Sequence, residues 1–270
     1  MKYVLFNPKS NNGRKPEYLE KVEYIEVLGL DYQAFFDGLK EEDEVVLVGG
    51  DGTLNYFINQ VDTDKVRNNV YLKPNGTGND FKADLGREDD EEILLNDYIK
   101  NLPTVYVNGR EQKFIDGIGY GIDGYCCEAA DAIRASGSSK KINYTAIAIK
   151  GMLFYFKQRN AVVTVDGKEY SFKDVWLAAS MKGRFYGGGM MVAPAQDRKG
   201  DTLSLVVYHA KSKLKTLMVF PSIFKGTHVE HTEMVSVMTG KEIEVKFDKP
   251  CALQIDGETV RDVSSYRVKA

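Results

Sequence analysis

The sequence predicts two domains: an α/β domain built on a doubly wound parallel sheet, then a β-rich, sandwich-like domain. Up to about residue 101, short apolar strands alternate with segments of helical spacing, which is typical of a parallel sheet covered by helices. Later apolar runs are separated by Asn-Gly and Asp-Gly turns, which favours antiparallel pairing in a sandwich or flattened barrel. We therefore predict domains of residues 1–103 and 104–270, and expect that the last strand can return toward the first domain.

The composition is that of a globular protein in a reducing compartment. The chain is 43% hydrophobic and 28% charged, and its formal net charge of −3 gives no electrostatic argument for a nucleic-acid partner. The three cysteines form no disulfide framework, and no apolar run approaches the roughly 20 residues of a membrane span. No N-terminal signal pattern is visible, so we expect a cytoplasmic protein, with peripheral attachment to a membrane as the alternative.

Four strands and three helices are expected in the first domain. Apolar runs predict strands at residues 2–6, 24–28, 45–48 and 70–72. Helical spacing predicts helices at residues 30–40, from about residue 53, and at residues 91–100, where a string of acids would suit a helix start.

The strand at residues 45–48 runs directly into a glycine loop, Gly49-Gly50-Asp51-Gly52-Thr53. Three glycines in four positions indicate a sharp turn that another molecule can approach closely, and the N–H groups at a helix start suit a phosphate. Asp51 would repel a bare phosphate, so it fits only if a divalent cation or a reacting hydroxyl lies between them. A tight glycine corner with an incidental acid is the alternative.

A second glycine loop, residues 74–81, follows the strand at 70–72 and also contains an acid, Asp80. Two such loops after neighbouring strands are hard to explain as turns alone. The polar loop from Asn7 to Lys15 follows the first strand, and we interpret it as phosphate-facing because ligands collect at the carboxyl ends of such strands. A solvated loop is the alternative.

The second domain is expected to be mainly β. Strands are predicted at residues 104–107, 112–116, 161–165, 169–172, 175–181, 203–209, 234–238, 243–247 and 252–255. A helix is predicted at about residues 140–157. Its apolar stripe, Ile142 to Phe156, is flanked by lysines, and we expect it to be packed core, with a contact to a lipid acceptor as the alternative.

Six motifs in a fixed order extend over nearly the whole chain: Asn7-Pro8, Gly49–Asn55, Pro74–Phe81, Gly121–Gly124, Tyr186–Met190 and Asp256–Glu258. Together they resemble the diacylglycerol kinase catalytic family, which is related to sphingosine kinases and distantly to NAD kinases. The resemblance implies an NAD kinase-like α/β domain, a β-sandwich domain, and ATP with Mg²⁺ in the cleft between them.

The resemblance also implies roles for individual residues. Asp51, Asp80 and Asp123 match acids that organise magnesium and water around the phosphates, and Glu258 matches the general base, with Asp256 beside it. Asp51 is a rival for the role of base. The residues that match nucleotide-binding positions are Asn7, Ser10, Gly49, Gly50, Gly52, Thr53, Asn55, Gly76, Thr77 and Asn79.

One departure from the family pattern concerns a second metal. The segment of residues 197–203 supplies a structural magnesium site in some members, but here the order of Gly and Asp is exchanged. Asp197 and Asp201 can still be assigned to an ion, and an exposed polar turn is at least as good an interpretation.

The function that these residues predict is an ATP-dependent kinase acting on a lipid hydroxyl at a membrane surface, with diacylglycerol as the first acceptor to consider. The alternatives are an NAD kinase-like enzyme with a soluble acceptor, and a non-catalytic relative that binds nucleotide or lipid. The sequence leaves the oligomeric state open, a homodimer included.

Overall fold

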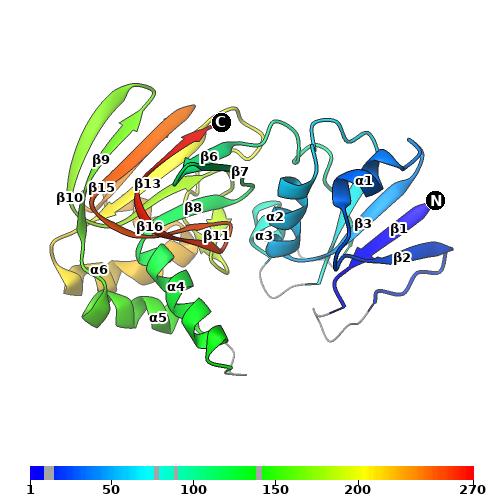
Figure 1. Ribbon diagram of the computed structural model, residues 1–270. Coiled ribbons are helices and arrows are strands. Elements are labelled where there is room, and N and C mark those ends of the chain that lie inside the picture. The colour runs from blue at the N-terminus through cyan, green and yellow to red at the C-terminus, as the bar shows by residue number, and fades with distance from the viewer. Residues whose placement is uncertain (9–14, 76–78, 88–90, 138–141) are drawn as a thin grey trace. The chain divides into compact units, whose positions relative to one another are not determined.

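The computed structural model describes residues 1–8, 15–75, 79–87, 91–137 and 142–270 (Figure 1). The chain divides into two compact units, Met1–Leu102 and Pro103–Ala270. Five strands form the sheet of the first unit, in the order β2-β1-β3-β4-β5. Their bounds are β1 Lys2–Phe6, β2 Val22–Glu26, β3 Glu44–Gly49, β4 Asn69–Pro74 and β5 Ile93–Leu94.

The first four strands pair in parallel and β5 is antiparallel to β4, so the predicted α/β domain is confirmed, with one antiparallel edge. The helices are α1 (Tyr32–Asp37), α2 (Asp51–Gln60) and α3 (Asp80–Asp84). Aromatic rings join α1 to α2, since Tyr32 and Phe36 both contact Phe57, and Phe35 of α1 contacts Tyr3 of β1. The expected second strand at 24–28 begins two residues earlier, and α2 begins at Asp51 rather than near Thr53.

The predicted helix at residues 91–100 is wrong. The segment contains the short strand β5, in which Ile93 pairs with Leu72, and the chain then turns. Asn96 holds this turn against the sheet: its side chain accepts a hydrogen bond from Val70 N (2.9 Å) and donates one to Asn68 O (2.8 Å). The edge of β4 therefore finds hydrogen-bond partners that a helix at these residues could not have offered.

The second unit contains a nine-stranded sheet in the described part of the chain, and all of its strand pairs are antiparallel. Its strands are β6 Thr104–Val107, β7 Arg110–Lys113, β8 Gly117–Gly121, β9 Arg159–Val165, β10 Lys168–Met181, β13 Leu203–His209, β14 Val235–Gly240, β15 Glu242–Ile255 and β16 Glu258–Lys269. A separate hairpin joins β11 (Phe185–Tyr186) to β12 (Met190–Met191).

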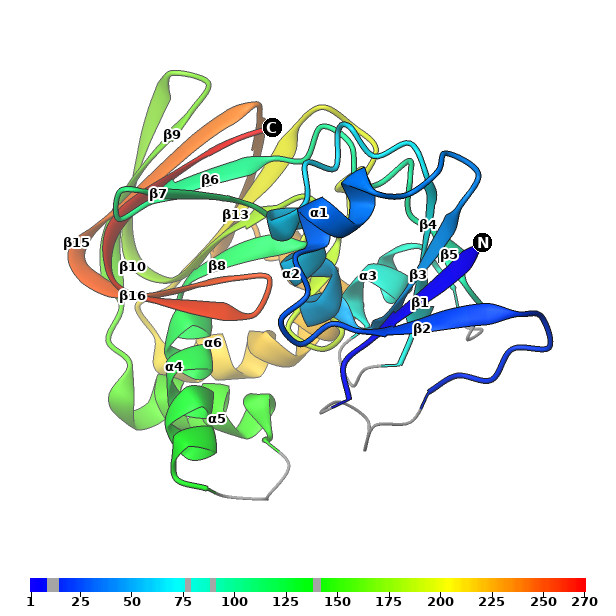
Figure 2. The same ribbon diagram turned by 45° about the vertical axis from the view of Figure 1, so that its right-hand side comes forward.

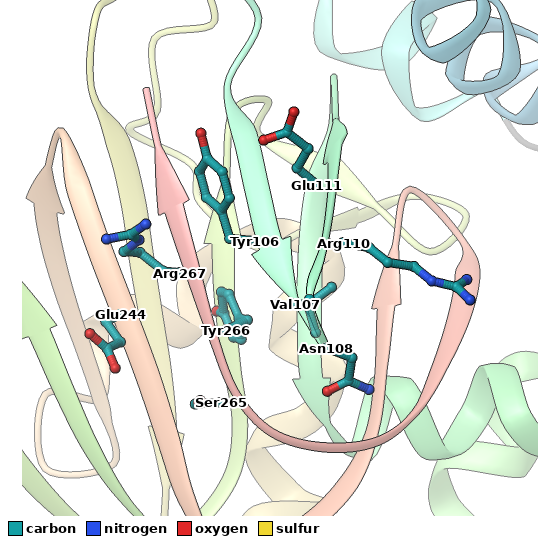
Figure 3. A pocket seen from close by; sticks show the side chains of 10 residues that line it. Tyr106, Val107, Asn108, Arg110, Glu111, Glu244, Ser265, Tyr266 and Arg267 are labelled. Carbon is teal, nitrogen blue, oxygen red and sulfur yellow. The ribbon is translucent and has the colours of Figure 1, made fainter.

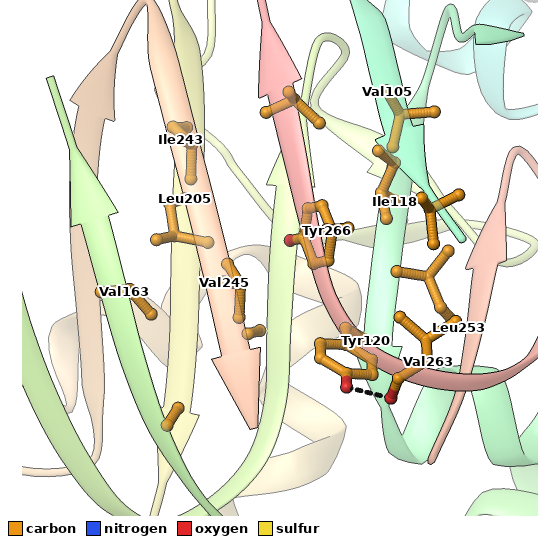
Figure 4. Close-up of a cluster of buried hydrophobic side chains, with 14 of the residues drawn as sticks. Val105, Ile118, Tyr120, Val163, Leu205, Ile243, Val245, Leu253, Val263 and Tyr266 are labelled. Atoms are coloured by element: carbon orange, nitrogen blue, oxygen red, sulfur yellow. Dashed lines mark hydrogen bonds between the residues drawn. The ribbon is translucent and has the colours of Figure 1, made fainter. Parts of the chain in front are cut away.

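Two long strands fold this sheet back on itself. The first halves of β10 and β15 both pair with β9, and their second halves both pair with β8. The enclosed core is apolar, with Tyr120 stacked on Phe247 and its hydroxyl donating to the Val263 carbonyl (Figure 4). The predicted β-rich domain is confirmed, and pairs of expected strands turn out to be single long ones that bend at bulges.

The helices of this unit lie together on one side of the strands (Figures 1 and 2). They are α4 (Ile122–Ala135), α5 (Tyr144–Lys150), the π-helix η2 (Gly151–Tyr155), α6 (Lys213–Val219) and the 3-10 helices η3 (Phe220–Lys225) and η4 (Thr227–Glu230). Helix α4 was not predicted. The helix expected at about 140–157 is confirmed in α5 and η2.

The last strand, β16, forms a long hairpin with β15. β16 pairs with β15 over most of its length and with β6 at its end, so it belongs to the sheet of the second unit. The Asp-Gly turn at residues 256–257 connects β15 directly to β16, which is why the two strands are hairpin neighbours.

His228 of η4 predicts a pH dependence of stability. The side chain is 0% exposed, its Nε2 lies 3.0 Å from Val192 O, and burial lowers its pKa to about 4. In the unfolded chain the pKa is about 6.5, so between these values only the unfolded chain binds the proton, and stability falls as the pH falls. Between pH 7 and pH 5 this loss should be about 1–2 kcal/mol.

Urea unfolding at pH 7 and pH 5 measures this contribution as the difference between the pH dependences of the wild type and His228→Gln, because the shifted pKa values of Asp123 and His209 act in both proteins. His231→Gln is the matched control, because that ring is 42% exposed and the burial of His228 remains in this variant. An identical pH dependence in the wild type and His228→Gln would contradict the assignment.

Candidate functional site

In the first unit, the predicted nucleotide residues that the structure describes lie at one edge of the sheet. Phe6 pairs with Val48, and Gly49 with Pro74, so β1, β3 and β4 end at the same level. Asn7 follows β1 at this edge, and Asn75 N donates to Gly49 O (2.9 Å). Because the strands are parallel, Asn7 after β1 and Asn75 after β4 lie at the same edge of the sheet. The predicted residues Ser10, Gly76 and Thr77 lie outside the described residues.

Asp51 connects the two glycine loops. It is the first residue of α2, and its carboxylate accepts hydrogen bonds from Asp80 N (2.9 Å) and Phe81 N (3.2 Å). These amides open α3, so one carboxylate lies at the start of two helices, where negative charge is favourable. Asp80 and Asn55 are both buried near this junction.

Gly49 allows this arrangement because of space. A Cβ at Gly49 would lie 2.0 Å from Thr53 Oγ1, so no other residue fits without moving the start of α2. A Cβ at Gly52, by contrast, would meet no described atom within 4 Å. Packing among the described residues therefore explains why a glycine is needed at Gly49, but it does not explain the glycine at Gly52.

In the second unit, Asp123 lies at the start of α4 beside Tyr186 and Gln254. The Tyr186 hydroxyl donates to the Asp123 carboxylate. A Cβ at Gly119 would lie 2.5 Å from Asp123 Oδ2 and 3.0 Å from Gln254 Nε2, so this glycine makes room for both side chains. Burial raises the pKa of Asp123 to about 7. The carboxyl group is thus held in a setting that disfavours its charge unless a cation is close.

Asp256 and Glu258 have different surroundings, although they are two residues apart. The Asp256 carboxylate accepts hydrogen bonds from three backbone amides, those of Ile115 (2.8 Å), Asp116 (3.0 Å) and Gly117 (2.9 Å). Glu258, the first residue of β16, is exposed. Asp256 therefore fixes the backbone that leads into β8, while the Glu258 side chain is open to solvent.

A buried ion pair lies next to this backbone. Arg198 donates to Asp116 Oδ1 (2.6 Å) and to Ile115 O (2.6 Å), and the two side chains of the pair are only 6% and 3% exposed. Lys182 Nζ donates to Gly200 O (2.7 Å), and burial together with nearby Arg198 lowers its pKa. The loop of residues 197–201 is thus attached to the sheet by two buried cations.

The predicted metal residues Asp197 and Asp201 engage different partners. Asp197 Oδ1 accepts from Lys199 N (2.9 Å), and Asp201 Oδ2 forms an exposed ion pair with Lys241 (2.5 Å). Throughout the described residues, no three His, Cys, Asp or Glu side chains are placed to hold a metal ion. Magnesium commonly uses one or two carboxylates together with substrate phosphates, so Asp51 and Asp80 of the first unit still fit it.

A hollow of about 540 Å³ in the second unit contains none of the predicted site residues. It lies over the ends of β6, β7, β15 and β16 and is lined by charged side chains such as Arg110, Glu111 and Arg267 (Figure 3). Arg267 there already stacks on Tyr106 and pairs with Glu242. We assign it no role in the chemistry. In the described part of the chain, no helix has both the length and the apolar character to cross a membrane.

Comparison with known families agrees with the arrangement of both units. The "diacylglycerol kinase catalytic domain" matches residues 2–106, and the "YegS C-terminal NAD kinase beta sandwich-like domain" matches residues 117–268. The chain belongs to the diacylglycerol kinase catalytic family. The resemblance seen in the six motifs is thereby confirmed.

Individual relatives are distant. A diacylglycerol kinase of Mycobacterium tuberculosis strain H37Rv is 26% identical over 215 residues, covering 77% of this chain and 68% of the relative. A solved diacylglycerol kinase structure from Bacillus anthracis strain Sterne has a TM-score of 0.63 and 17% identity, covering 99% of this chain and 92% of its own. Another solved structure from that strain reaches a TM-score of 0.70 at 18% identity, covering 99% and 91%. These structural likenesses show the fold.

Sequence reasoning missed three residues around the acids of this family member. Gln254 is polar and 3% exposed within the apolar run of residues 252–255, which was a usable signal. The hydroxyl of Tyr186 belonged to a recognised motif but was given no role. The pairing of Arg198 with Asp116 had no signal, because the partners are 82 residues apart.

The Arg198–Asp116 pair predicts a specific stability pattern. Arg198→Met should cost about 3–5 kcal/mol of unfolding free energy, because it leaves the Asp116 carboxylate buried without its counter-ion. The double variant Arg198→Met/Asp116→Leu should cost less than Arg198→Met, because it removes both charges. Urea unfolding measures all three proteins. Lys241→Met, at an exposed pair, is the control and should unfold like the wild type. A double variant less stable than Arg198→Met would contradict the pattern.

Proposed function

We propose that this chain is an ATP-dependent lipid kinase that transfers the γ-phosphoryl group to a lipid hydroxyl presented at a membrane surface, with diacylglycerol as the first acceptor. The observation that supports this best is the Asp51 carboxylate, which lies at the start of α2 and bonds the amides that open α3. In a member of this family, two loops joined in this way are a reasonable frame for a triphosphate.

The nucleotide is proposed to bind at the edge where β1, β3 and β4 end. The N-cap of α2 is Gly50, which has no side chain, and a Cβ at Gly52 would meet no described atom within 4 Å, so a ligand can approach the start of this helix. The residues proposed to line it are those predicted from sequence: Asn7, Ser10, Gly49, Gly50, Gly52, Thr53, Asn55, Gly76, Thr77 and Asn79.

Asp51, Asp80 and Asp123 are proposed to hold Mg²⁺ through its water shell. The Asp51 carboxylate lies where the two glycine loops meet, which is where the phosphates are proposed to bind. When bound, Mg²⁺ neutralises charge that develops on the phosphates. The raised pKa of Asp123 fits a carboxyl group whose charge is stabilised only when a cation arrives.

Glu258 is proposed as the general base that takes the proton of the acceptor hydroxyl. Its exposure allows a substrate to reach it, whereas Asp256 has its carboxylate committed to three amides. We therefore propose that Asp256 positions Glu258 through the turn that both share. Asp51 is the remaining candidate for the base.

Phosphate transfer from γ-labelled ATP to a panel of diacylglycerol, other lipid alcohols and NAD tests the function. We expect transfer to a lipid and none to NAD. Asp51→Asn and Glu258→Gln should each lower kcat at least about 100-fold, which is the usual contribution of a catalytic acid or base. Glu244→Gln, at another exposed strand residue, is the control and should keep wild-type kcat. Wild-type turnover in both site variants would disprove the mechanism, and transfer to NAD alone would favour the soluble-acceptor alternative.

A pair of glycine variants tests the nucleotide site separately. Gly52→Ala should unfold in urea like the wild type, because the added methyl group meets no described atom, yet bind ATP at least about tenfold more weakly by calorimetry. Gly49→Ala should lose stability, because its methyl group collides with Thr53. Unchanged ATP affinity in Gly52→Ala would contradict a phosphate at the start of α2.

A further inference from the structure

The helices of the second unit expose a group of large apolar side chains, which we call the apolar patch: Ile149, Leu153, Phe154, Tyr155, Leu214, Met218 and Phe224. The most exposed are Met218 (73%), Phe154 (72%) and Leu214 (71%). Monomeric proteins scatter such side chains singly, so a gathered set indicates an interaction site.

These side chains are not needed for the core. The opposite faces of the same helices supply it, with Ala148, Met152 and Phe156 on one segment and Val219 and Ile223 on the other, packed around Trp176. Leu214 and Met218 are four residues apart on α6, and therefore share a face. The expectation that the stripe of residues 142–156 is packed core holds for only one face of it.

The patch is continuous across two segments that are distant in sequence. Lys213 Nζ, at the start of α6, donates to Leu153 O in η2 (3.1 Å), and α6 runs directly into η3. The rings of Phe154 and Tyr155 contact each other. Figures 1 and 2 both show α5 and α6 on the same side of this unit.

The charge around the patch has one sign. Residues 142–157 and 210–226 contain no Asp or Glu, and their lysines are all exposed: Lys150, Lys157, Lys211, Lys213, Lys215 and Lys225. Glu233, from outside these segments, pairs with Lys215. Since the whole chain has a net charge of −3, this face is basic on an otherwise acidic protein.

We propose that the apolar patch docks on an anionic lipid bilayer, with the apolar side chains entering the interface and the lysines contacting headgroup phosphates. Charge favours this occupant over a second copy of the chain, because a symmetric dimer would bring like-charged lysine sets together. The inference rests on the proposed function, since a lipid kinase must meet its acceptor at a bilayer, and it names the surface that does so.

Vesicle flotation of the full chain tests the docking. We expect binding to phosphatidylcholine vesicles that contain about 30 mol% phosphatidylglycerol, weaker binding to pure phosphatidylcholine, and a loss with added salt. Phe154→Ser/Leu214→Ser/Met218→Ser should bind at least about tenfold more weakly to the anionic vesicles. Lys150→Gln/Lys157→Gln/Lys225→Gln should bind both vesicle types almost equally.

The control is Leu28→Ser/Val237→Ser, which removes apolar side chains of 49% and 45% exposure elsewhere and should bind like the wild type. Because the altered patch residues are so exposed, thermal unfolding of the patch variants should match the wild type. Unchanged vesicle binding in the triple serine variant would overturn the proposal. The proposal would also be overturned if the wild type did not bind vesicles and instead formed a dimer that the triple serine variant does not form.

Activity separates this inference from the proposed function. With a short-chain diacylglycerol dissolved as monomers, the triple serine variant should phosphorylate at the wild-type rate, and with the same acceptor in anionic vesicles it should be at least about tenfold slower. A wild type that binds vesicles but phosphorylates no acceptor would leave the docking surface standing and refute the kinase. Equal loss of activity on both acceptors would overturn the docking role.

Discussion

The arrangement of the first unit depends on one interaction, the pair of hydrogen bonds from the amides of Asp80 and Phe81 to the Asp51 carboxylate. Two parallel strands place their following loops at one edge, but strand register alone leaves the loops free to diverge. The carboxylate joins the start of α2 to the start of α3, and its charge suits both helix N-termini. This contact requires the glycine at Gly49, because any side chain at that position would displace Thr53.

The second unit uses a carboxylate in a similar way. Asp256 reaches across about 140 residues of sequence to hold three successive amides before β8. Since β8 leads into α4, the position of Asp123 follows from the same bonds. An acid that matches a family motif can therefore serve the backbone first, and its contribution to chemistry is then indirect. The exposed Glu258 shows the contrast within one turn.

The sequence was informative where a local pattern decides the structure. The strands at residues 2–6 and 203–209 and the turn at Asn108-Gly109 were correctly predicted, because apolar runs and left-handed turn residues act locally. The strand β5 was missed because its stabilisation comes from the distant edge of β4. The helix α4 was not predicted because Gly117, Gly119 and Gly121, just before it, interrupt the helical spacing of apolar residues. In the structure these glycines belong to β8 and allow its close packing. β16 was missed because few of its side chains are buried.

In the loop of residues 197–201, charged contacts made only in the folded chain change how the sequence motif should be interpreted. Its sequence offers two carboxylates to an ion, but the folded loop brings Arg198 and Lys182 into the interior beside Asp116. Asp201 in turn has Lys241 as its ion-pair partner. The positive charge beside Asp116 is supplied by Arg198 of this loop, a pairing that the order of Gly and Asp in its sequence did not indicate.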